Sequence, residues 1–244
     1  MREHRRANKV IIAAKPSFLL LALTFLLLGA SALFLVRQPG CLPRPSNGDR
    51  DSFSIAESSL LRPGDLILRR GSSIASDLIV TVLQDGSGLS HCALVMANNG
   101  KEISLLHSVN ASFGGADGVQ VTQLAAFNRN SLPHSLVVLR PLATAAELHA
   151  IETMAENFRD HPAAFDNDFD LSDRRSLYCS ELMVSIFEAA GWWPPTRNGL
   201  SPLYRMTGKM LNFQTFLTSG RFRVIISHNP AWSPVAGPLS AFIH

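Results

Sequence analysis

The sequence predicts an α+β fold in which helices pack against an antiparallel sheet. Several β-rich segments follow one another along the chain, and an Asn-Gly turn separates two of them. The two longest amphipathic helical patterns come together later, just before a closing strand. Strands and helices that are segregated in this way are typical of α+β domains, and Asn-Gly is a strong hairpin signal.

The first half of the domain is predicted to hold a strand, a helix and a β-hairpin. The turn Arg62-Pro63-Gly64-Asp65 leads into the first strand, and Ser72 or Ser73 provides an N-cap for the helix. Alternating and apolar patterns then mark the hairpin. The expected elements are a strand at 66–69, a helix that ends before Gly86-Ser87-Gly88, a strand at 89–97, a turn at 98–100 and a strand at 102–109.

The second half is predicted to hold two helices among further strands. Thr144-Ala145-Ala146-Glu147 is a capping box, and apolar residues at helical spacing follow it. A second helix begins at Cys179, after the loop-rich and acidic segment 160–177, and ends before Gly191. The expected strands are 119–122, 136–140 and 221–227, with a glycine-rich loop at 114–118.

A basic head, an apolar segment and a tether are expected to precede this domain. Phe18–Val36 carries no charge, and a helix of that length, at about 1.5 Å per residue, spans a bilayer core. Basic residues gather in the head at 1–17, so the head is expected to be cytoplasmic and the domain exported, periplasmic or extracytoplasmic, on a single-pass anchor. A signal peptide cleaved at Ala30-Ser31-Ala32 is the alternative. The predicted layout is completed by a linker at 37–59, a catalytic domain at 60–228 and an irregular apolar tail at 229–244.

Charge and cysteine content argue against several classes of protein. The net charge is +3, but the basic head supplies it and the rest of the chain is close to neutral, so no nucleic-acid footprint is expected. Three cysteines are an odd number without the spacing of a zinc site. The sequence also lacks the G-x-S-x-G, H-E-x-x-H and Walker motifs.

Cys179 is the expected catalytic nucleophile, and His91 is its expected general base and acid. Cys179 begins a predicted helix, where unpaired backbone N–H groups and the helix dipole favour a thiolate. His91 lies at the start of a predicted strand, and an imidazolium near the sulfur would favour the thiolate again and then protonate a leaving group. Neighbouring strand residues point to opposite faces, so Cys92 is assigned to the core.

The predicted hairpin supplies a third residue. Pairing about the Asn99-Gly100 turn places His107 near His91, where it is expected to orient the imidazole. The backbone N–H groups of the helix start, together with Tyr178 and Ser180, are candidates for an oxyanion hole. This chemistry requires no metal and no organic cofactor.

Three other ionisable residues have different interpretations. Asp65 follows Pro63-Gly64 and is interpreted as a turn residue, and Glu181 suits the positive end of the helix dipole. His228 ends the last predicted strand. A pairing of Cys179 with His228 is the alternative to His91, although it leaves the Ser90-His91-Cys92 segment without a role.

Three blocks of the sequence resemble those of the permuted papain-like amidases, and most closely the YiiX-like group of the NlpC-type superfamily. They are, in order, Pro63-Gly64-Asp65-Leu66-Ile67, Ser90-His91-Cys92-Ala93-Leu94-Val95 and Tyr178-Cys179-Ser180-Glu181-Leu182. The resemblance covers roughly residues 60–228. By position, Cys179 matches the nucleophile, His91 the base and His107 the third polar residue, which is often an acid in this group.

The resemblance implies a permuted papain-like fold and cysteine chemistry on amide or ester bonds in peptides, cell-wall peptides or lipids. The hypothesis is therefore a membrane-anchored cysteine hydrolase that acts on such a substrate. One alternative is a lipid acyltransferase or thioesterase on the same fold, which the membrane tether and apolar tail make reasonable. The other is a non-catalytic domain that binds peptides.

Overall fold

The computed structural model describes residues 51–114, 116–171, 174–193, 204–207 and 210–232. The helices are α2 (Ile55–Leu60), α3 (Ile74–Leu83), α4 (Ala111–Gly114), α5 (Leu124–Arg129), α6 (Ala145–Asp160), α7 (Cys179–Ala189), α8 (Gln214–Leu217) and a 3₁₀ turn at Pro230–Trp232. The strands are β1 (Leu66–Arg69), β2 (His91–Asn98), β3 (Ile103–Val109), β4 (Gly118–Gln123), β5 (Val137–Pro141), β6 (Met206–Thr207), β7 (Met210–Leu211) and β8 (Phe222–Ser227).

A six-stranded antiparallel sheet forms the centre of the domain, with the strand order β4-β3-β2-β1-β5-β8. The strands β6 and β7 form a separate short pair. This architecture confirms the α+β class and the antiparallel sheet. It also places β1 and β2 in the middle of the sheet, and β2 begins with His91 of the predicted site.

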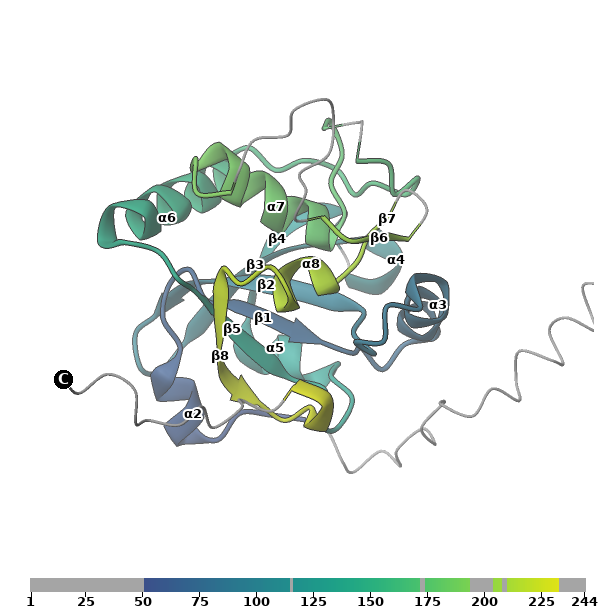
Figure 1. The fold of residues 1–244 in the computed structure, drawn as a ribbon, viewed down its shortest axis with the longest axis horizontal. Coiled ribbons are helices and arrows are strands. Elements are labelled where there is room, and N and C mark those ends of the chain that lie inside the picture. Colours follow the sequence, from purple (N-terminus) through teal and green to yellow (C-terminus); the bar gives the residue numbers. More distant parts are fainter. Residues whose placement is uncertain (1–50, 115, 172–173, 194–203, 208–209, 233–244) are drawn as a thin grey trace, which may run out of the picture. The chain divides into compact units, whose positions relative to one another are not determined.

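Helices cover both faces of the sheet, which corrects the expectation that they pack on one side only. The long helices α6 and α7 lie over one face, and α2 and α5 lie on the other (Figure 1). The reason is visible in β1, whose four residues are all buried. A strand that is apolar on both faces has to be covered on both. Leu66 and Leu68 pack with α7, whereas Ile67 packs with α5.

Local sequence signals account for where several elements begin and end. The Oγ1 of Thr144 accepts from the N–H of Glu147, and the Glu147 carboxylate accepts from the N–H of Thr144, so the predicted capping box opens α6. At the end of α7, Gly191 has a φ of +69°, a conformation that L side chains rarely adopt. These elements are as predicted because their signals depend only on near neighbours in the chain.

The β2–β3 hairpin contains an irregularity that shifts its register. Leu94 pairs with Leu106 and Asn98 pairs with Ile103, with a shift of the register between Val95 and Ala97. Such a β-bulge adds one residue to one strand and changes which residues face each other beyond it. The result is that residues 91 and 107 are offset along the hairpin while still on the same face.

The folded domain begins earlier than expected. Residues 51–59 were assigned to the linker, but in the structure they include most of α2 and its capping box between Ser54 and Glu57. The carboxylate of Asp51 accepts from the backbone N–H groups of Ser135 and Leu136 at 2.9 and 3.0 Å. These long-range bonds hold the segment to the sheet, and no local pattern reveals them.

The N-terminal predictions fall on residues that the structure does not describe. These are the head at 1–17, the apolar segment at 18–36 and most of the linker. Among the residues that are described, no helix combines the length and apolarity needed to cross a membrane. The predicted tail from 229 is described only as far as Trp232.

Candidate active site

The start of α7 is held in place by the strands beneath it. The Oγ of Ser108 on β3 donates to the carbonyl of Leu177 at 2.6 Å, and the N–H of Leu177 donates to the carbonyl of Ala164 at 2.9 Å. These bonds fix the chain two residues before Cys179. Every residue from Cys179 to Phe187 is buried, so packing fixes the helix as well.

The sulfur of Cys179 lies among hydrogen-bond donors. They lower the pKa of the Cys179 thiol: the thiol of Cys92 has the largest effect, and the backbone N–H groups of Cys92, Ser180 and Cys179 contribute further. Burial opposes them by raising the pKa. Cys179 is 9% exposed, so only a small part of this residue faces solvent. The predicted helix-terminus environment of the thiolate is therefore present.

Cys92 has a second role beside the core position expected for it. It is fully buried in the core beneath α7, as predicted. Its thiol also donates to the sulfur of Cys179, and burial together with this bond raises the pKa of Cys92 well above its ordinary value. The protonated partner of the pair is therefore Cys92. Sequence reasoning missed the contact because it depends on how α7 lies across β2.

His91 and His107 contact each other, as the hairpin predicted. The Nε2 of His91 and the Nδ1 of His107 are 2.9 Å apart, which makes a hydrogen bond. Both rings pack against Phe127 of α5, with centroid separations of 5.6 and 6.1 Å. The Nε2 of His107 is buried and has no hydrogen-bond partner among the described residues.

Arg69 completes this histidine cluster, although the sequence did not single it out. It pairs with His91 across β1 and β2, and its guanidinium carbon lies 4.3 Å from the centre of the Phe127 ring. Ser90 holds this end of the two strands, because its N–H donates to the carbonyl of Arg69 and its Oγ accepts from the N–H of Gly71. A basic residue at the end of a strand that pairs with the histidine strand is the signal that would have found it.

The electrostatics of the cluster keep both imidazoles neutral. Burial lowers the pKa of His91 well below its ordinary value; the charge of Arg69 lowers it further, and so does the repulsion from His107 that protonating both rings would create. Burial and the charge of Arg69 lower the pKa of His107 to about 4. The expected imidazolium beside the thiolate is therefore not favoured here, since Arg69 already supplies a buried positive charge.

The two pairs of residues meet at the beginning of β2 from opposite faces of the sheet. Cys92 and Cys179 pack on the α7 side, whereas His91 and His107 lie on the α5 side against Phe127. No hydrogen bond joins His91 to Cys179 within the described part of the structure. His91 and Cys179 are connected only through Cys92. Cys92 follows His91 in the sequence, and its thiol and backbone N–H bind the sulfur of Cys179.

The side chains of Tyr178 and Ser180 have structural partners. The hydroxyl oxygen of Tyr178 accepts from the N–H of Leu211 at 2.8 Å, and the Oγ of Ser180 donates to the carbonyl of Leu211 at 3.1 Å. Both hydroxyls thereby tie α7 to β7. Of the oxyanion candidates, it is the backbone N–H groups at the start of α7 that face the sulfur of Cys179.

The weaker candidates are occupied elsewhere. Asp65 accepts two hydrogen bonds from Arg140 at 2.8 and 2.7 Å and one from the N–H of Arg62, which fits its interpretation as a turn residue. Glu181 accepts from the N–H of Tyr178 at the helix start. The ring nitrogens of His228 lie 2.6 Å from Asp51 and 2.9 Å from Glu57. Both ring nitrogens of His228 are therefore bound to carboxylates next to the edge strand β8, and His228 does not pair with Cys179.

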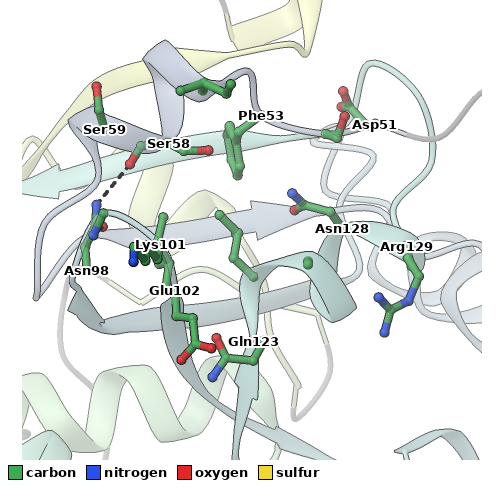
Figure 2. A pocket seen from close by; sticks show the side chains of 16 residues that line it. Asp51, Phe53, Ser58, Ser59, Asn98, Lys101, Glu102, Gln123, Asn128 and Arg129 are labelled. Carbon is green, nitrogen blue, oxygen red and sulfur yellow. Dashed lines mark hydrogen bonds between the residues drawn. The ribbon is translucent and has the colours of Figure 1, made fainter.

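A pocket of about 790 Å³ lies at the other end of the hairpin. It is bounded by α2, the β2–β3 turn and α5, and Figure 2 shows Phe53, Asn98, Asn128 and Arg129 around it. None of the predicted site residues lines it. This pocket and the residues with catalytic chemistry are therefore in different places.

Comparison with known proteins supports the fold. Neither a protein-family model nor a curated protein matches this sequence. Among solved structures, the chain is similar to the crystal structure of the metalloprotein YiiX from Escherichia coli O157:H7, which is also described as DUF1105. The match covers 69% of this chain and 98% of that chain, with a TM-score of 0.52 and 17% identity. A likeness at this identity establishes a YiiX-like fold.

Proposed function

We propose that this protein is a cysteine hydrolase of permuted papain-like, NlpC-type fold that cleaves an amide or ester bond, with Cys179 as the nucleophile. The substrate is a peptide, a cell-wall peptide or a lipid, and the N-terminal segment anchors the exported domain to the membrane. The observation that carries the proposal is the environment of the Cys179 sulfur. It combines a helix start, backbone N–H donors and a neighbouring thiol, all of which lower its pKa.

In the proposed reaction, His91 acts as a neutral base and then as an acid. Its Nε2 is bound to His107, so Nδ1 is the nitrogen that exchanges protons, and His107 fixes the ring. As the sulfur attacks the acyl carbon, the thiol proton passes to Nδ1. The carbonyl oxygen becomes an oxyanion that accepts hydrogen bonds from backbone N–H groups at the start of α7. The leaving nitrogen or oxygen then takes the proton from His91.

Deacylation reverses the same proton transfers. Water attacks the thioester carbon and gives a proton to Nδ1 of His91, and the proton returns to the sulfur as the carbon–sulfur bond breaks. The products are a carboxylic acid and the regenerated thiol. Because His91 and Cys179 pack on opposite faces of β2 and His107 holds the His91 ring, this proton transfer requires the beginning of β2 to rearrange and bring Nδ1 to the sulfur when substrate binds.

The YiiX structure is titled a metalloprotein, but the donor set among the described residues of this chain does not fit a metal site. In the part of the chain that the structure describes, no group of three or more His, Cys, Asp and Glu side chains is arranged to hold a metal ion. No step of the proposed mechanism therefore passes through a metal.

The proposal is tested with the purified full chain and a panel of p-nitrophenyl esters and peptide p-nitroanilides. Cys179→Ala is expected to lose at least a hundredfold in rate on any substrate that the parent cleaves, whereas the matched control Cys41→Ala retains it. His91→Ala is expected to lose hydrolysis while Cys179 still reacts with iodoacetamide. Full activity in Cys179→Ala would refute the assignment.

Acyl transfer is the second outcome that the same site supports. If an alcohol or amine takes the place of water in the second step, the acyl group ends on that acceptor. Mass spectrometry of the products from a lipid ester substrate distinguishes the two, because hydrolysis releases a free acid and transfer leaves a new ester or amide. An unreactive Cys179 thiol at neutral pH would instead favour the non-catalytic, peptide-binding alternative.

A further inference from the structure

The pocket between α2, the β2–β3 turn and α5 has the size and the lining of a ligand site. Its volume of about 790 Å³ lies within the range of about 300–1,000 Å³ that is typical of such sites. Its apolar walls include the side chains of Phe53, Ile55, Ile103 and Leu124. Ile55 is 92% exposed, so part of this apolar surface has no cover within the described structure. A ligand site of this kind combines apolar walls with a few polar groups that orient the ligand.

Asn128 supplies such a polar group. Its side chain lines the pocket, and Figure 2 shows its amide pointing from α5 toward Phe53. Asn128 is only 8% exposed, yet its Oδ1 is buried without a hydrogen-bond partner among the described residues, and its Nδ2 donates to none of them. A buried amide without partners is costly, so a group that bonds to it inside the pocket would be strongly favoured.

Other polar side chains of the lining are already engaged. The Nδ2 of Asn98 donates to the carbonyls of Ser58 and Leu61 at 3.0 and 2.9 Å, and its Oδ1 accepts from a backbone N–H of the turn (Figure 2). The carboxylate of Asp51 accepts from two backbone N–H groups. These side chains hold the walls of the pocket in place, which leaves the amide of Asn128 to a ligand.

The charged groups at the rim do not favour a strongly charged ligand. Lys101 and Arg129 are exposed cations of the lining, and Glu102 is an exposed anion beside Lys101. None of the ion pairs found in the described part of the chain includes these three residues. Since both signs are present in the solvated rim, the apolar walls and the amide of Asn128 are left to determine which ligand fits.

We propose that this pocket binds a short peptide, with one peptide group paired to the amide of Asn128 and an apolar side chain against Phe53 and Leu124. A peptide group offers one N–H and one C=O, which match the acceptor and the donor of a primary amide. A plain hydrocarbon chain would leave that amide unpaired. The inference goes beyond the proposed hydrolase and does not rest on it, because none of the predicted catalytic residues lines the pocket.

The experiment uses the purified full chain in lipid nanodiscs and the neutral peptide acetyl-Ala-Leu-Ala-amide. A copy of the peptide that carries a diazirine in its leucine side chain is photolysed with the protein, and mass spectrometry locates the crosslinks. Competition by the unlabelled peptide measures the affinity. Crosslinks are expected within 51–59, 98–103 and 123–129, which are the segments that line the pocket.

Two variants change the pocket in different ways. Asn128→Leu removes the amide at similar size and is expected to fold, because that amide has no partner among the described residues. It is expected to weaken peptide binding about tenfold or more. Ala125→Trp fills the hollow from an exposed position of its lining and is expected to abolish competition. The matched control is Asn157→Leu, an exposed asparagine of α6 outside the pocket, which is expected to bind as the parent does.

Ester analogues of the peptide test the hydrogen bond itself. Each analogue replaces one peptide N–H by an oxygen, and one of them is expected to bind the parent about tenfold more weakly but to lose nothing further in Asn128→Leu. The proposal is overturned by crosslinks that map outside the three segments, by crosslinks with which 10 mM unlabelled peptide does not compete, or by parent affinity in folded Asn128→Leu. A parent that binds the peptide here but hydrolyses no substrate would refute the hydrolase assignment and leave this inference standing.

Discussion

The thiol of Cys92 donates a hydrogen bond to the sulfur of Cys179, and this contact has the largest effect on the acidity of the candidate nucleophile. It joins the second residue of β2 to the first residue of α7. The pairing of β2 with β3 runs from Asn98–Ile103 to Leu94–Leu106, so Cys92 lies beyond its end. That position leaves its N–H available to the sulfur as well.

Replacing Cys92 with alanine is expected to raise the pKa of Cys179. A hydrogen bond to a charged group contributes about 1.5–3 kcal/mol, which corresponds to an increase of about one to two pKa units. The measurement is the pH dependence of Cys179 alkylation in Cys92→Ala, with thermal unfolding recorded in parallel because the residue is also part of the core. An unchanged profile in a folded variant would show that the thiol contact does not matter.

The buried histidine His107 is expected to make the domain less stable in weak acid. Its pKa falls from an ordinary 6.5 to about 4 on folding, so the unfolded chain binds the proton first as the pH decreases. The contribution of His107 to stability is present above pH 6.5 and is lost as the pH falls toward 4, by up to about 3 kcal/mol. Urea unfolding at several pH values measures it. His107→Gln should show a flatter dependence, and an equally steep one would contradict the assignment.

His228 is expected to act with the opposite sign. The carboxylates of Glu57 and Asp51 raise its pKa despite partial burial. Its contribution to stability is therefore complete below its unfolded pKa and is lost as the pH rises through the higher folded value. The group is partly exposed, so we expect no more than about 1 kcal/mol. The protection factors of the amides in residues 51–60, which correct the exchange rate for its intrinsic dependence on pH, should fall at alkaline pH in the parent, and in His228→Gln they should be low at every pH.

The ion pair between Arg140 and Asp65 is expected to support the fold without affecting the thiol. Asp65 is 1% exposed, so Arg140→Met would leave a nearly buried carboxylate without its cation, at a cost of about 3 kcal/mol. The unfolding midpoint in urea measures this loss. The alkylation profile of Cys179 should stay as in the parent, and a shifted profile would indicate that Asp65 takes part in the site.

The sequence predicted those parts of the candidate site that depend on one strand or one helix. Cys179 at a helix start follows from the loop before it and the apolar pattern after it. The contact of His91 with His107 follows from a hairpin centred on Asn99-Gly100. The alternation of strand residues also predicted that His91 and Cys92 point to opposite faces, which the packing confirms.

Other parts of the site could not be predicted, because they depend on which elements meet across the sheet. Arg69 and Phe127 join the histidines only because β1 lies beside β2 and α5 packs on that face. The hydroxyl of Tyr178 was a candidate donor to an oxyanion, but in the structure it accepts a hydrogen bond from the N–H of Leu211, which lies far along the chain. No local pattern specifies such a partner.

The sequence by itself determined the α+β class, the hairpin, the capped helix α6 and the start of α7, because each follows from side-chain periodicity, caps and turn residues among near neighbours. Tertiary structure alone decided the order of the strands, the helices on the second face and the partners of Cys179. Those features depend on burying both faces of the central strands, and that condition is met by residues far apart in the chain.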